Sequence, residues 1–162
     1  MKTAPTDIDR EAATLFTPSP GMRVMHEIAH VVRPASHKGR EVCEMRPAWV
    51  RIVTARDAGT CRAFAVEGNA TVGRRAYQME YFVARASMFL QAIDTDDPAT
   101  VGCMLAQVED AAGTDDVSVE KLRPYGRGFA VFIRGSYSHA PGPTKGAALV
   151  AAMRALKSTP TR

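Results

Sequence analysis

The C-terminal third of the chain contains the segment Phe129-Ala130-Val131-Phe132-Ile133-Arg134-Gly135-Ser136-Tyr137. Its β-branched and aromatic residues alternate with smaller or polar ones, which predicts a strong strand. Residues 117–122 before it are also strand-like, and residues 124–126 form a turn between the two. Pro141-Gly142-Pro143 then breaks the chain, and Thr144 caps a final alanine-rich helix. The sequence therefore predicts a compact β-β-α unit over residues 117–158.

The segments that precede this unit are predicted mainly as helices. Asp97-Pro98 is typical of a helix cap and first turn, and this helix ends near Gly113. Residues 75–93 carry apolar residues with gaps of three and four, which predicts an amphipathic helix. These apolar residues are Met79, Phe82, Ala86, Phe89 and Ile93. Residues 47–66 fit either a helix that begins at Pro47 or two strands that turn near residues 57–60.

The bulk properties favour a globular protein with one main domain. The chain has 162 residues, and 46% of them are hydrophobic, which is enough for a core. We expect residues 1–20 to be a flexible lead-in and residues 21–162 to form a single α+β domain. No apolar stretch reaches the length of a membrane span. Three cysteines without a C-x-x-C pair favour a reducing, cytoplasmic location.

A five-residue motif points to chemistry: His26-Glu27-Ile28-Ala29-His30 spells H-E-x-x-H. We expect residues 22–33 to form a helix, because their apolar positions match a period of 3.6 better than strand alternation. On a helix the two histidines lie at i and i+4 on one face and can bind one zinc ion. Glu27 then serves as the general base that takes a proton from the metal-bound water.

This segment resembles the small zinc peptidases of the SprT-like and related minimal H-E-x-x-H type, over about residues 20–57. In that family a short loop and a third histidine follow the motif helix. The resemblance implies that His37 is the third ligand of Zn²⁺ and that the protein hydrolyses a peptide or protein substrate. Lys38 stands where the family pattern has glycine. His139 or a carboxylate is the alternative third ligand.

The predicted fold is therefore α+β, with an H-E-x-x-H helix near the N-terminus and central amphipathic helices. The C-terminal β-β-α unit is expected on a small mixed or antiparallel sheet.

The charge distribution supports a competing, non-catalytic function. The net charge is +4, yet residues 86–120 contain no Lys or Arg, and basic residues return from Lys121 onward. Arg123, Arg127 and Arg134 surround the predicted hairpin. The alternative is therefore an accessory protein that binds nucleic acid or a protein partner through an arginine-rich surface. Nucleic-acid binding by these residues predicts a steep dependence on salt and no dependence on chelators.

Overall fold

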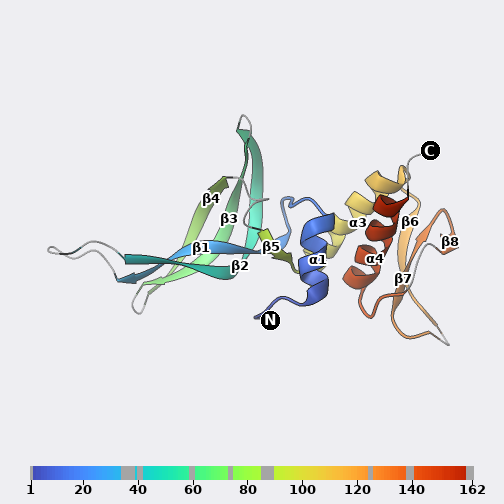
Figure 1. The fold of residues 1–162 in the computed structure, drawn as a ribbon, viewed down its shortest axis with the longest axis horizontal. Coiled ribbons are helices and arrows are strands. Elements are labelled where there is room, and N and C mark those ends of the chain that lie inside the picture. Colours follow the sequence, from blue (N-terminus) through green and yellow to red (C-terminus); the bar gives the residue numbers. More distant parts are fainter. Residues whose placement is uncertain are drawn as a thin grey trace.

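A computed structural model describes residues 2–33, 39, 42–58, 61–72, 75–84, 90–123, 126–137 and 141–159. For much of the five-stranded sheet the description is of the backbone. The elements in chain order are α1 (Asp7–Leu15), β1 (Arg23–Arg33), β2 (Val42–Ala58), β3 (Cys61–Val72), β4 (Arg75–Ala84), β5 (Leu90–Ile93), α3 (Pro98–Ala112), β6 (Val117–Lys121), β7 (Phe129–Ile133), β8 (Ser136–Tyr137) and α4 (Lys145–Ser158). The fold is mixed α+β, as the sequence predicts. The helices lie between two separate antiparallel sheets (Figure 1).

The larger sheet has the strand order β4-β3-β2-β1-β5, and its long strands extend away from the helices (Figure 1). All of its neighbouring strands are antiparallel. β2 and β3 form a hairpin, so the two-strand alternative for residues 47–66 is confirmed and the helix from Pro47 is wrong.

The predicted helix over residues 22–33 is wrong, because Arg23–Arg33 form strand β1. β1 pairs with β2 from Arg23 opposite Arg51 to Val31 opposite Cys43, and its first part also pairs with β5. Two neighbouring strands satisfy the backbone groups that a helix would satisfy locally. The apolar spacing in this segment fits both periods, and the partner strands decide between them.

The predicted helix over residues 75–93 is also wrong where the structure describes it, and residues 85–89 lie outside the described residues. Arg75–Ala84 form β4, which pairs with β3 along its whole length, and Leu90–Ile93 form β5. The run Tyr77-Gln78-Met79-Glu80-Tyr81 alternates apolar and polar residues, which is the pattern of a half-buried strand. The spacing of three and four residues between the apolar positions is therefore coincidental.

The first twenty residues are not a flexible lead-in, because α1 packs into the core. Thr6 caps α1 and forms a capping box with Asp9. The side chains of Ala12 and Phe16 are buried, and Asp9 is fully buried. The sequence contains a signal for this helix. Thr6 stands three positions before Asp9, and an apolar helical stripe follows.

The C-terminal predictions are largely confirmed. α3 begins after its cap Asp97 and ends at Gly113, whose φ of 66° is left-handed. Thr144 caps α4, as predicted. The predicted strand over residues 129–137 is divided into β7 and β8 by a tight turn. β6, β7 and β8 form a three-stranded antiparallel sheet.

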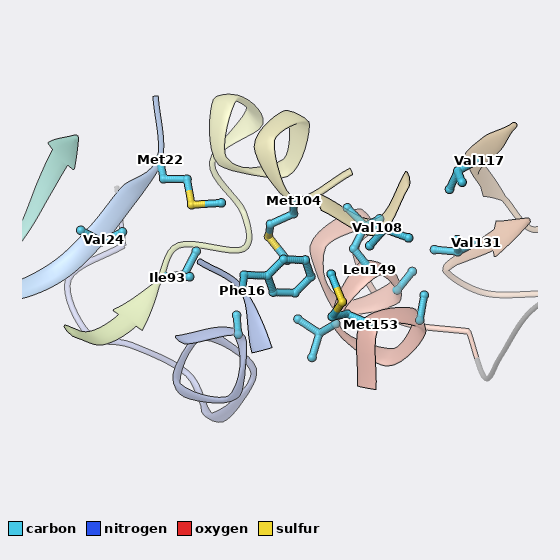
Figure 2. Packing of buried hydrophobic residues seen from close by; sticks show 14 of the residues in the cluster. Phe16, Met22, Val24, Ile93, Met104, Val108, Val117, Val131, Leu149 and Met153 are labelled. Atoms are coloured by element: carbon cyan, nitrogen blue, oxygen red, sulfur yellow. The ribbon is translucent and has the colours of Figure 1, made fainter. Parts of the chain in front are cut away.

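One hydrophobic core joins the large sheet, the helices α1, α3 and α4, and the small sheet. Its buried residues include Val24 and Ile93 from the large sheet, Met104 from α3 and Leu149 from α4. Figure 2 shows Phe16 beside Met104, with Val24 and Ile93 on one side and Val131 beyond the helices on the other. The small sheet is thereby fixed to the rest of the protein. Among the described residues, no helix is both long and apolar enough to cross a membrane.

Candidate nucleic-acid interface

The H-E-x-x-H residues lie in β1 and do not share a helix turn. His26 stands opposite Ala48 and His30 opposite Glu44 in the neighbouring strand. Four strand residues span about 13 Å between Cα atoms, whereas i and i+4 on a helix have Cβ atoms about 5–6 Å apart. Position 27 belongs to the opposite face of the strand from positions 26 and 30. The backbone therefore does not supply the compact arrangement on which the zinc prediction was based.

The third-ligand candidates, His37 and His139, lie outside the described residues. The structure describes the backbone of His26, Glu27 and His30 but not their side chains. Among the side chains that are described, no group of three or more His, Cys, Asp or Glu is placed to hold a metal ion. Zinc binding by these histidines stays a prediction.

The last part of the chain is strongly basic. Residues 117–162 contain eight Lys or Arg and one acid, Glu120, which gives this part a net charge of +7. The whole chain has a net charge of only +4. Ser118 donates a hydrogen bond to Glu120 at 3.0 Å. The basic residues of this region therefore have few acidic neighbours in sequence.

Two of these basic residues hold α4 against the N-terminal segment. Arg154 donates two hydrogen bonds to Glu11 of α1, at 2.5 and 2.7 Å. Lys157 donates to the carbonyl of Leu15. Their charges are thus already used within the fold.

Five others are exposed and form no ion pair within the described part of the chain. They are Lys121, Arg123, Arg127, Arg134 and Lys145. An exposed lysine or arginine without a carboxylate partner retains its full attraction for an external anion. These five are the candidate phosphate contacts.

Four of the five meet at one end of the small sheet, and we call Lys121, Arg123, Arg127 and Lys145 the cation cluster. Backbone hydrogen bonds bring their segments together. Leu122 donates to Gly128 at 3.0 Å, while Phe129 and Gly142 exchange hydrogen bonds at 2.8 and 2.9 Å. The end of β6, the start of β7 and the start of α4 therefore lie side by side.

Glycines make this close approach possible. Gly128 has a φ of 106°, and a Cβ at this position would lie 2.4 Å from the carbonyl oxygen of Gly142. A side chain at position 128 would therefore separate the β6–β7 loop from the segment that leads into α4. The cation cluster depends on this contact between backbones.

Arg134 lies at the opposite end of β7, in the turn to β8. Arg134 and Gly135 have φ values of 52° and 71°, and Ile133 pairs with Ser136 across them. Two central residues with positive φ are the mark of a type I′ hairpin turn. Arg134 is the one described non-glycine residue with positive φ, which is a costly conformation for an arginine. Local strain of this kind is concentrated at functional positions.

Two carboxylates, the half-buried Asp97 and the buried Asp9, hold segments of the fold together. Arg51 of β2 donates to both oxygens of Asp97, at 2.8 and 3.1 Å, and thereby lowers the pKa of Asp97 to about 2. Burial opposes ionisation of Asp9, but hydrogen bonds from Lys2, Thr95 and Thr6 outweigh it and lower the pKa of Asp9 to about 2. Both carboxylates are therefore charged at neutral pH and serve to join segments.

The sequence had singled out Arg123, Arg127 and Arg134 but not Lys121 or Lys145. The count of charges from residue 121 onward would have included both. The β6–β7 pairing brings Lys121 beside the start of β7. The approach of Lys145 to Arg127 was not visible in the sequence, because it depends on the pairing of Phe129 with Gly142. No protein-family model, curated protein or solved structure matches this chain.

Proposed function

We propose that this protein is a non-catalytic nucleic-acid-binding protein that contacts phosphates through its C-terminal unit. The observation that carries the proposal is the set of five exposed basic residues, without ion-pair partners among the described residues, in a region with a single acid. Basic side chains on one structural unit supply most of the affinity of such proteins for nucleic acid.

The number of contacts sets the expected dependence on salt. Each phosphate that a protein neutralises on duplex DNA contributes about −0.9 to the slope of log K against log salt. Five contacts give a slope of about −4.5. Because these contacts reach phosphates and not base edges, we expect weak dependence on base sequence.

Fluorescence anisotropy with a labelled duplex oligonucleotide, at several salt concentrations, tests this proposal. We expect a double variant, Arg123→Gln with Arg127→Gln, to bind more weakly and to have a slope smaller by about 1.8. Arg10→Gln is the matched control, because Arg10 is an exposed arginine on α1 that pairs with Asp7. Equal slopes for the wild type and the double variant would refute the proposal.

The zinc hydrolase remains the alternative proposal. It rests on the residue types of the H-E-x-x-H motif, because strand β1 does not provide the helical spacing of the two histidines. In this proposal His26, His30 and His37 bind Zn²⁺, and Glu27 is the general base for hydrolysis of a peptide substrate. Elemental analysis of the purified protein tests it directly. Absence of zinc, or equal zinc in a His26→Ala/His30→Ala variant, rules it out. If the protein is a zinc hydrolase, a chelator should abolish hydrolysis. If it is a nucleic-acid-binding protein, a chelator should leave binding unchanged.

A further inference from the structure

A cavity of about 410 Å³ adjoins the cation cluster. It lies where the N-terminal ends of α3 and α4 meet the start of β7. Lys145 belongs both to its lining and to the cation cluster. Arg127 lies two residues before Phe129, another lining residue. The cavity and the cation cluster therefore form one continuous surface.

One side of the cavity is apolar. Pro98 and Val101 contribute from the first turns of α3, and Phe129 contributes from the start of β7. Phe129 is held by its two backbone hydrogen bonds to Gly142. Aromatic side chains next to a basic groove are the usual platform on which nucleobases stack.

The other side presents polar groups with unused hydrogen-bonding capacity. Lys2 donates to Oδ2 of Asp96 at 2.8 Å, and no described group donates to Oδ1 of Asp96. The hydroxyl oxygen of Thr144 accepts from the backbone of Ala147 at 3.2 Å, which leaves its hydrogen free to donate. The cavity therefore offers an acceptor, a donor and the cation of Lys145 around an apolar wall.

The cavity is built on a tightly packed support. A Cβ on Gly146 would lie 2.0 Å from the carbonyl oxygen of Thr95, so α4 rests directly on the segment that follows β5. Thr95 in turn donates from its backbone and hydroxyl to Asp9, at 3.0 and 2.8 Å. The lining is thus positioned before any ligand arrives, which lowers the entropic cost of binding.

We propose that this cavity receives one unpaired nucleobase, so that the ligand is a single-stranded nucleic acid whose phosphates lie along the cation cluster. The proposal rests on the nucleic-acid-binding function proposed above. A nucleobase combines a flat apolar face with a polar edge and is attached to an anionic phosphate, which matches the wall, the polar groups and Lys145. The bases of a duplex are paired and stacked, and extruding one costs free energy.

The experiment compares a single-stranded oligodeoxynucleotide of about 12 nucleotides with the blunt duplex of the same sequence, within the range that one small domain covers. Affinities are measured by anisotropy for the full-length wild type and for Val101→Trp, which fills the cavity. Gly102→Trp is the matched control, because a Cβ at this exposed position of α3 has no atom within 4 Å. Val101→Phe, a smaller addition, is measured alongside, and thermal unfolding by circular dichroism establishes that each variant is folded.

We expect Val101→Trp to lower the affinity for the single strand by about 10-fold, the order of one lost base contact, and to leave duplex affinity unchanged. Val101→Phe should act in the same direction, and Gly102→Trp should match the wild type. An unchanged single-strand affinity in both Val101 variants, or an equal loss for both ligands, overturns the cavity proposal while phosphate binding stands. If the wild type binds neither ligand, the proposed function itself fails.

Discussion

Replacement of Asp9 by asparagine tests whether the N-terminal helix is part of the fold or an appendage. The Asp9 side chain is fully buried, and each of its oxygens accepts a backbone N–H. Oδ1 accepts from Thr95 at 3.0 Å, and Oδ2 accepts from Thr6 at 2.7 Å. Asparagine has the same shape but only one acceptor oxygen. Its amide nitrogen would therefore face one of these backbone donors and leave that donor unpaired.

Two independent considerations give the size of the effect. An unsatisfied buried donor costs about 1–3 kcal/mol. The pKa of Asp9 falls from its ordinary value of 3.8 to about 2, which corresponds to roughly 2 kcal/mol, because one pKa unit is equivalent to about 1.4 kcal/mol. The two overlap and are not added. We expect Asp9→Asn to lower the free energy of unfolding at pH 7 by about 1–3 kcal/mol, a large part of a typical total.

Urea unfolding followed by circular dichroism measures this loss, and Asp7→Asn is the control. Asp7 lies in the same first turn of α1, but its side chain is fully exposed, so we expect a much smaller change. Because the folded-state pKa of Asp9 is depressed, its contribution is complete above about pH 4 and is lost as pH falls towards about 2. The wild type should lose stability in this window, and Asp9→Asn should lose less. Equal stability of the two variants would refute the buried anchor.

Three further substitutions test the packing of α3 and α4 and the turn between β7 and β8. Gly146→Ala should destabilise the protein by about 1–3 kcal/mol, because its Cβ would lie 2.0 Å from the Thr95 carbonyl oxygen. Gly102→Ala should stabilise it by about 0.5–1 kcal/mol through helix propensity. Thermal unfolding of both measures this contrast, and a common effect would contradict the packing described for α4. Arg134→Asn should raise the free energy of unfolding by about 0.5–1 kcal/mol, because asparagine tolerates positive φ, yet weaken oligonucleotide binding. Loss of stability in this variant, or unchanged binding, would contradict the role assigned to the turn.

The candidate interface was only partly predictable. Arg123, Arg127 and Arg134 stood out as basic residues around a hairpin, and this required only the composition of a short segment. Lys145 belongs to the cation cluster only because the β6–β7 loop contacts the segment that leads into α4. Gly128 and Gly142 permit this contact. The cavity beside Lys145 requires three segments to meet and has no sequence signature.

Elements whose signals are local can be predicted from the sequence alone. Asp97-Pro98 and Gly113 mark the ends of α3, and Thr144 marks the start of α4, because capping uses side chains within a few residues of the backbone groups they satisfy. That the β1 and β4 segments are strands depends on tertiary pairing. Their apolar spacing fits a helix as well as a strand, and a strand is stable only beside partners from elsewhere in the chain. β1 between β2 and β5, and β4 beside β3, have those partners. Because of this strand pairing, the segment with the H-E-x-x-H motif is a strand and not the helix that the zinc prediction required.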